Sequence, residues 1–386
     1  GILGAALSTG NIVTLSYIVT NAEESNGASS FSLSGTLGGF SNVTITTATN
    51  SANGAQPETP DSIRFNAPKQ YAAQNRAVTP KDYESRVKSI YANAKSVSVW
   101  GGEDNSTPVY GRVYIAIKPV AGATLTEATK TDIINKLKEF NVASITPIIQ
   151  DPETTSVQLN VSVKYDAKST SRTADSVKAL VTSAITNFNT TNLQEFDSIF
   201  RHSKFIETIN KADDSILSNI TTVKLHKSFT AVTTGSTTYT ISFNNALYNP
   251  HSGHNATGGG ILVSSGFKIS GDATNEYFLD EDGAGNVRLY YLVGQVRTYT
   301  NNTQGTIDYT NGTITLNSLF ITEVSNVDGA TSTAVRLTVI PNSVDVVPVR
   351  NQIIEIDETN TTVTVSADDY ETTSGIGYTT ATSYAS

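Results

Sequence analysis

"TTSVQLNVSVKYD", residues 154–166, alternates apolar and polar side chains over most of its length. The apolar positions are every second one: Val157, Leu159, Val161 and Val163. Successive side chains of a strand point to opposite faces, so these four share one face. Such a face needs a covering layer, and the flanking sequence offers helices for it. The stretch therefore predicts a long strand of a mixed sheet covered by helices.

Working outward, strands and helices alternate in a regular order from residue 112 to residue 229. Thr124 and Glu127 have the spacing of a capping box, which predicts a helix running to about Phe140. The other expected elements are strands at 112–119, 144–150 and 218–229 and helices at 173–187 and 203–211. The order β-α-β-β-α-(α)-β is that of a ferredoxin-like sandwich, which we expect as one α/β domain over 112–229.

A second helix signal precedes this region. Thr79 is suited to the N-cap, and Pro80 follows at the first helical position, where its missing N–H costs nothing. Apolar side chains then recur at helical spacing to about residue 93, and "SVSVW", 96–100, reads as a strand. Residues 61–111 are thus a helix–strand connector that ends in a Trp-Gly-Gly corner.

The two ends of the chain have a different pattern of apolar and polar residues. Residues 1–60 contain β-branched alternating runs at 11–20 and 29–48, which predict a β-rich segment of a larger N-terminal region. After residue 230 helical periodicity vanishes, and short alternating runs are separated by turn signals such as "EDGAGN" and "TNGT". We expect an all-β domain over 230–368, followed at 369–386 by a loose tail or an arm ordered by a partner. The fold class is therefore α+β.

The overall composition argues against some classes of function. The net charge is −9 without basic blocks, which argues against nucleic-acid binding and against an anionic membrane surface. Only 16% of residues are charged, and cysteine and methionine are absent. The start at Gly1 is unlike a native one and suggests a fragment or a processed product. No run approaches the about 18 apolar residues of a transmembrane helix.

Candidate chemistry is sparse. His251 and His254 are a weak metal candidate, since zinc and iron sites need three or more protein ligands and no third is specified nearby. A calcium-loop start at Asp280 has Tyr291 where a bidentate acid is required. The acid pairs Glu103–Asp104 and Asp213–Asp214 read as turn or cap residues. We therefore expect no enzyme, no cofactor and no tightly bound metal.

Three features carry a resemblance to a known family. They are the helix start "AVTPKDY" at 77–83, the corner "WGGE" at 100–103 and the strand "GRVYIAIKP" at 111–119. In this order they resemble the baseplate J family of contractile-tail phages and related injection machines, and within it the wedge proteins of T-even-type phages. The likeness covers roughly residues 60–230.

The resemblance implies a non-enzymatic virion component of the tail baseplate, assembled in the host cytoplasm. Wedge proteins of this kind are similar in acting as homodimers that join wedges into a ring around the tail hub. The implied partners are other copies of the chain and other wedge and hub proteins, with no nucleic acid and no membrane. A surface low in charge and rich in Tyr agrees with an interface role.

The Trp-Gly-Gly corner has two open interpretations, a subunit interface or an internal anchor of a monomer. In both, Trp100 is expected to pack against the 79–93 helix through Tyr83 or Val87, and Gly101 and Gly102 to adopt backbone angles that other residues resist. Two rival functions also stay open. One is a receptor- or glycan-binding tail protein that grips its ligand with the C-terminal β domain, and the other is a tail-associated hydrolase.

Overall fold

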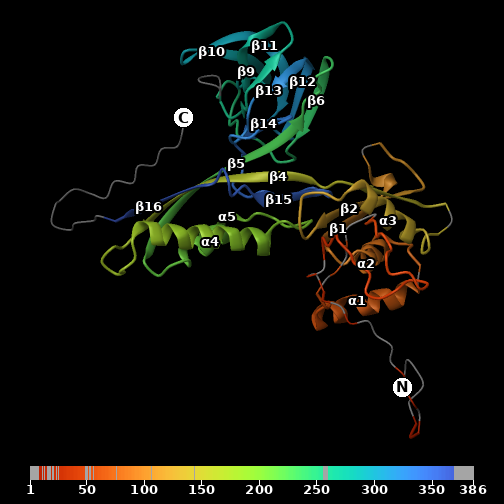
Figure 1. Ribbon diagram of the computed structural model, residues 1–386. Helices are drawn as coiled ribbons and strands as arrows, with labels where there is room; N and C mark the ends of the chain where they lie inside the picture. Colours follow the sequence, from red (N-terminus) through yellow and green to blue (C-terminus); the bar gives the residue numbers. More distant parts are fainter. Residues whose placement is uncertain are drawn as a thin grey trace. The chain divides into compact units, whose positions relative to one another are not determined.

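The computed structural model divides the chain into two compact units, residues 1–150 and 151–386. Figure 1 labels the elements of each unit. The structure describes residues 8–368 apart from 11, 13, 15–18, 20, 23, 25, 48–50, 52, 53, 55, 75, 106, 143 and 255–259. The predicted tail at 369–386 lies outside the described residues. Within the described part, no helix is long and apolar enough to cross a membrane.

The first unit is a three-stranded sheet with helices. Its elements are α1 (Pro60–Ala73), α2 (Pro80–Ile90), β1 (Ala94–Gly101), the 3-10 turn η1 (Gly102–Asp104), β2 (Arg112–Pro119), α3 (Glu127–Leu137) and β3 (Thr146–Gln150). The strand order is β1-β2-β3, with β2 antiparallel to β1 and parallel to β3. The core joins α2 and α3 to the sheet through Tyr83, Val87, Ile115, Ile133 and Leu137.

Helix starts in this unit follow their capping side chains. The α2 prediction is confirmed, since the Thr79 hydroxyl accepts from the Asp82 N–H and the Asp82 carboxylate accepts from the Thr79 N–H at 2.8 Å. The α3 start was placed two residues early, because Thr126 rather than Thr124 is the N-cap. Helix α1 was not predicted, although Thr59 and Pro60 repeat the signal of α2.

The N-terminal strands expected at 29–48 do not form in the described residues. Leu37 and Phe40 form an isolated bridge, but no ladder extends from it. Phe31, Val43 and Ile45 are exposed, so the alternation there has no neighbouring strand to pair with and no layer to bury its apolar face. Most of the run at 11–20 lies outside the described residues.

The second unit holds two sheets. Its helices are α4 (Ala174–Asn192) and α5 (His202–Asn210), and its strands are β4 (Glu153–Tyr165), β5 (Ile216–Thr230), β6 (Thr237–Ser242), β7 (Val263–Ser264), β8 (Phe267–Ile269), β9 (Asp272–Glu281), β10 (Asn286–Val293), β11 (Val296–Asp308), β12 (Thr313–Leu319), β13 (Ile321–Val324), β14 (Ala334–Val339), β15 (Gln352–Ile356) and β16 (Thr362–Ala367). One sheet has the order β15-β4-β5-β14-β7, with β16 also on β4, and the other has the order β13-β8-β9-β10-β11-β12-β6.

The ferredoxin-like sandwich expected over 112–229 is not formed. Strands β2 and β3 belong to the sheet of the first unit, whereas β4 and β5 pair with each other in the second unit. The remaining neighbours of β4 and β5 come from beyond residue 333. The predicted order of elements is therefore correct, but the predicted strand pairing is wrong. Strand partners depend on packing between segments far apart in the chain, which the order of elements does not specify. The α+β class holds, and the limits of the five predicted segments stay predictions.

The seven-stranded sheet is formed by the part of the chain between β5 and β14, two strands that pair with each other. Thr230 at the end of β5 pairs with Ala334 at the start of β14, and β6 to β13 lie between them in the chain. The hairpins predicted around "EDGAGN" and "TNGT" are present as β9–β10 and β11–β12, and β10 and β11 form a further hairpin. Figure 1 shows α4 and α5 along the long strands β4 and β5. Alternate side chains of β4, predicted to share a buried face, lie in the core.

Candidate functional site

The Trp-Gly-Gly corner lies where β1 passes into η1. Trp100 of β1 is directly opposite Tyr114 of β2, and their rings stack at a centroid distance of 5.8 Å and an interplanar angle of 15°. Trp100 is 6% exposed. Its Nε1–H donates to Asn105 Oδ1 at 2.8 Å, so the one polar atom of the indole is satisfied. The corner is thus closed by an aromatic pair and a side-chain hydrogen bond.

The expected packing of Trp100 on helix α2 is replaced by this stack. Val97 and Val99 of β1 pack into the core that contains Tyr83 and Val87. Trp100 is one position further along the strand, so its side chain points to the opposite face. Tyr83 and Val87 are fully buried core residues on the α2 side.

Neither glycine has an unusual backbone angle, and only Gly102 is required for space. Gly101 has φ −74°, and Gly102 is not in the left-handed region either. A Cβ on Gly102 would lie 2.0 Å from the carbonyl oxygen of Val109, a backbone atom that cannot turn away. The Gly102 carbonyl in turn accepts from the Val109 N–H at 2.8 Å. The close approach of these two backbones therefore demands glycine at 102.

This backbone contact presents a tyrosine that sequence reasoning missed. Tyr110 follows Val109 directly and is 80% exposed. Gly111 has φ +76°, and its carbonyl accepts from the Thr146 N–H at 2.9 Å. Tyr110 is thereby displayed between two fixed backbone points. The signal in the sequence was the Tyr-Gly pair directly before an apolar strand. We name Trp100, Gly102, Tyr110 and Tyr114 the corner site.

The acid pairs behave as turn and cap residues. Glu103 and Asp104 lie exposed in η1. Asp213 accepts from the Ser215 N–H and hydroxyl and pairs with Arg172 at 2.9 Å. The hydrogen bonds from Ser215 and the Arg172 charge hold the Asp213 pKa below its usual range. Neither arrangement brings two carboxylates to one substrate-sized cleft.

His251 and His254 do converge, on each other. His254 Nδ1 lies 3.2 Å from His251 Nε2, and the rings are perpendicular at 4.8 Å. Among the described residues, no group of three or more His, Asp or Glu side chains is placed to hold a metal ion. The two facing nitrogens lie within hydrogen-bond distance of each other, and the tautomers of the rings decide which of them donates.

We expect the purified chain to contain no stoichiometric zinc or iron. The reason is that two imidazoles supply fewer than the three protein ligands of stable sites. Elemental analysis after dialysis checks this, with the double variant His251→Ala/His254→Ala as control. Stoichiometric metal that disappears in the double variant contradicts the prediction.

Two buried acids organise the seven-stranded sheet. Asp280 accepts from Arg288 Nε at 2.9 Å, from Arg297 Nη1 at 2.8 Å and from the Tyr299 hydroxyl at 2.8 Å. Glu281 accepts from the backbone N–H groups of Ile261 and Gly283 and from the hydroxyl of Tyr309. These bonds tie β9, β10 and β11 together. Both carboxylates have their hydrogen bonds made within the chain, which indicates that this network is structural.

A third acid, Asp357, is partly buried and links β5 to the segment that follows β15 in the other sheet. His226 Nε2 of β5 lies 2.7 Å from Asp357 Oδ2, just beyond β15. Asn360 donates to the same carboxylate through its backbone and its side chain. Burial raises the pKa of Asp357, but the hydrogen bonds from His226 and Asn360 outweigh it, and the net shift is downward.

Acid is therefore expected to weaken the fold through Asp357. A carboxyl whose pKa is depressed on folding contributes stability that is fully present above its unfolded pKa of about 3.9, and that is lost as pH falls through the folded pKa. We expect the free-energy difference between wild type and Asp357→Asn to be largest between about pH 5 and 7 and to shrink below about pH 4. Urea unfolding across this range measures it, and a difference independent of pH contradicts the assignment.

Comparison with known proteins matches the elements between residues 79 and 228 to domains of one protein. Residues 79–150 match the model for C-terminal domain I of the baseplate structural protein gp6, and residues 153–228 match that for its C-terminal domain III. The junction of the two matches coincides with the division between the two units at residue 150. Beyond residue 228 neither of these two models extends, so the seven-stranded sheet lies outside both.

The baseplate wedge protein gp6 of Enterobacteria phage T4 is 28% identical over 223 residues, which are 55% of this chain and 33% of that protein. The chain thus matches about a third of that relative's length. A cryo-EM structure of the anti-feeding prophage baseplate, 6-fold symmetrised, aligns with a TM-score of 0.35 and 13% identity over 47% of this chain and 43% of that chain. On the two domain matches and the identity to the T4 protein, this chain is similar to the gp6-like baseplate wedge proteins.

Proposed function

We propose that this chain is a structural wedge subunit of a contractile-tail baseplate, which dimerises and links wedges into a ring around the tail hub. The observation that carries the proposal is the pair of matches to C-terminal domains of a baseplate structural protein over residues 79–228. The place of action is the virion, and the partners are further copies of the chain and other wedge and hub proteins. The work is mechanical, through surfaces that mate, with no cofactor and no catalysis.

The corner site supports a contact role at Tyr110. Tyrosine is enriched in protein interfaces, and it loses little conformational entropy there because it has only two rotatable side-chain bonds. The loop is held at Gly102 and Gly111, so the ring is presented with its backbone already ordered. Pre-organisation of this kind lowers the entropic cost of association. Tyr110 is accordingly our candidate for an interface anchor.

Analytical ultracentrifugation of the full chain tests the proposal. We expect a dimer or larger assembly in the wild type, and a dissociation constant raised at least about tenfold by Tyr110→Ala, the effect of an interface anchor worth about 1.4 kcal/mol or more. Tyr71→Ala is the matched control, since Tyr71 of α1 is an exposed tyrosine of the same unit and lies outside the corner site. A monomer at all concentrations overturns dimerisation, and an unchanged constant in Tyr110→Ala overturns the role of Tyr110.

The glycan-binding alternative is less well supported. It needs free aromatic faces on the seven-stranded sheet, whereas the Tyr299 and Tyr290 rings are covered by Arg288 at 4.4 Å and Arg297 at 4.9 Å. The Tyr299 hydroxyl is also committed to Asp280. These rings are therefore engaged within the chain.

A further inference from the structure

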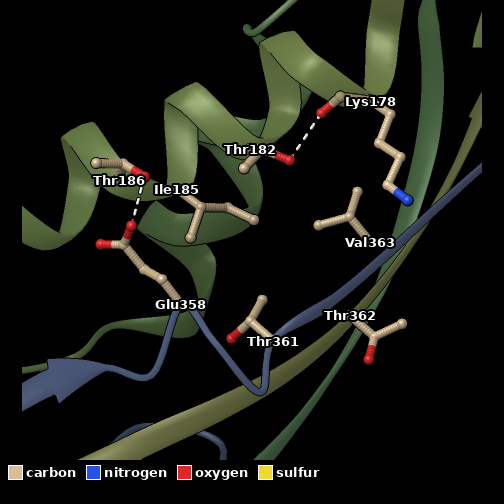
Figure 2. A pocket seen from close by; sticks show the side chains of 8 residues that line it. All are labelled: Lys178, Thr182, Ile185, Thr186, Glu358, Thr361, Thr362 and Val363. Atoms are coloured by element: carbon tan, nitrogen blue, oxygen red, sulfur yellow. Dashed lines mark hydrogen bonds between the residues drawn. The ribbon is translucent and has the colours of Figure 1, made fainter. Parts of the chain in front are cut away.

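The cleft between α4 and β16 has its groups engaged within the chain. Figure 2 shows the Thr186 hydroxyl donating to the Glu358 carboxylate, at 2.7 Å. Two apolar side chains that line the cleft, Ile185 and Val363, are already buried. This cleft therefore gives no reason to expect a partner. The large apolar side chains of residues 29–47 differ, because they are exposed.

Residues 29–47, which we name the apolar hairpin, carry a dense group of exposed apolar side chains. The members of this group are Phe31, Leu33, Leu37, Phe40, Val43 and Ile45. Those in the two arms alternate with polar residues, so each extended arm has one apolar face. Single exposed apolar residues are normal on a protein surface, but a large group of them indicates an interaction site.

The turn of the apolar hairpin is already formed. Leu37 and Phe40 exchange both of their backbone hydrogen bonds, at 3.0 and 3.1 Å. Gly38 and Gly39 between them have φ +60° and +88°. Positive φ at both central residues is typical of a type I′ turn, whose twist matches that of two antiparallel strands. The turn therefore directs the two arms to run back along each other.

The two arms also meet at their other end. The Thr47 hydroxyl donates to the Ser29 carbonyl at 2.7 Å, and the Gly27 N–H donates to the Ser51 carbonyl at 2.7 Å. Between this end and the turn, no backbone hydrogen bond joins residues 30–36 to residues 41–46, all of which the structure describes. The apolar hairpin is thus closed at both ends and open in its middle.

The two closed ends define a consistent register for the middle. Continued from Ser29 and Thr47, the pairing places Phe31 opposite Ile45 and Leu33 opposite Val43, which brings these four side chains to one face. The register at the turn differs from this one by a single extra residue in the first arm. Gly35 lies in that arm with φ +106°, the kind of position that a bulge with one extra residue uses.

We propose that the apolar hairpins of two copies of this chain pack face to face across a two-fold axis, and that the middle of each hairpin becomes hydrogen-bonded when they do. A two-stranded hairpin is marginal in water and needs a layer against its apolar face. A two-fold contact supplies this layer, because the same patch on both copies meets itself. The inference rests on the dimer of the wedge proposal and assigns one of its surfaces.

The distribution of charge favours a second copy as the occupant. No Lys, Arg, Asp or Glu occurs between Glu24 and Glu58, whereas the whole chain has a net charge of −9. Copies of an acidic chain repel one another, and this repulsion is weakest where a surface has no charge of its own. A partner selected by opposite charge would find nothing to pair with here. A ring of dimers needs two kinds of contact, so the apolar hairpin and Tyr110 can serve different ones.

Single cysteines test the contact directly, because the chain contains no cysteine. Phe31, Leu33, Val43 and Ile45 are replaced by cysteine one at a time. We expect more than half of at least one variant to form disulfide-linked dimers on non-reducing gels, since residues near a two-fold axis meet their own copies. Ser32→Cys and Thr44→Cys are the matched controls, because these exposed residues point to the opposite face of the same arms.

Analytical ultracentrifugation gives a second measurement. We expect Phe31→Ser/Ile45→Ser to raise the dissociation constant of the dimer at least about tenfold, and Ser32→Ala/Thr44→Ala to leave it unchanged. Phe31 and Ile45 are exposed, so their replacement leaves the buried core of the chain intact. Hydrogen exchange of residues 30–36 and 41–46 should slow at least tenfold when the protein concentration rises above the dissociation constant.

The outcomes separate this contact from the wedge proposal. A dimer whose dissociation constant is unchanged in Phe31→Ser/Ile45→Ser overturns the hairpin contact and leaves the wedge proposal standing, and so do equal cross-links from both faces. Slow exchange at every concentration shows that the apolar face is covered within the chain, which overturns the second copy as its occupant. A chain that stays monomeric at all concentrations overturns this contact together with dimerisation.

Discussion

Replacing Trp100 with alanine is expected to lower the free energy of unfolding of the first unit by about 3–5 kcal/mol, the usual cost of truncating a buried tryptophan. The change empties the space over Tyr114 and leaves Asn105 Oδ1 without its donor. Calorimetry of the full chain measures the effect as a lowered Tm of the transition that belongs to residues 1–150.

Trp100→Phe separates the contribution of the ring stack from that of the hydrogen bond, and a second variant serves as the control. Trp100→Phe keeps an aromatic ring on Tyr114 and loses the hydrogen bond to Asn105, so it should recover more than half of the loss. Tyr71→Ala changes an exposed side chain of α1 in the same unit and should shift the free energy of unfolding by less than about 0.5 kcal/mol. A loss under 1 kcal/mol in Trp100→Ala would show that the stack is not a structural anchor.

Replacing Asp280 with alanine is expected to cost the second unit about 3 kcal/mol, the lower end of the range for breaking a buried ion pair by removing one partner. Asp280 is 1% exposed and is the shared acceptor of Arg288, Arg297 and Tyr299. Its removal leaves two guanidinium groups facing each other without a counter-charge. We place the value at the lower end because Arg297 is partly exposed and can turn to solvent.

Chemical denaturation followed by far-UV circular dichroism measures this effect. Glu323→Ala is the control, since it removes an acid of the same sheet whose ion pair with Lys268 is solvent-exposed. Exposed pairs contribute about 0–1 kcal/mol, so the control should stay within that range. Equal losses in Asp280→Ala and Glu323→Ala would refute the view that the buried carboxylate holds β9, β10 and β11 together.

Local signals predicted much of the secondary structure. Thr79 and Pro80 mark the start of α2, the alternation at 157–163 marks β4, and the glycine-containing turns mark the hairpins of the seven-stranded sheet. These signals succeed because a cap, a face and a tight turn each depend on a few neighbouring residues. The position of the corner was readable for the same reason, from Trp100, Gly101 and Gly102.

The sequence by itself determined where strands, turns and most helices begin, and it pointed to the group of relatives through the motifs between residues 77 and 119. The tertiary structure decided which strands pair: β4 takes β15 and β16 as neighbours, about 200 residues along the chain. It also decided that Trp100 faces Tyr114, that Gly102 is needed for a backbone contact, and that Tyr110 is left exposed. The reason is physical, because pairing and burial are settled by the free energy of the whole packed layer, to which distant segments contribute as much as neighbours.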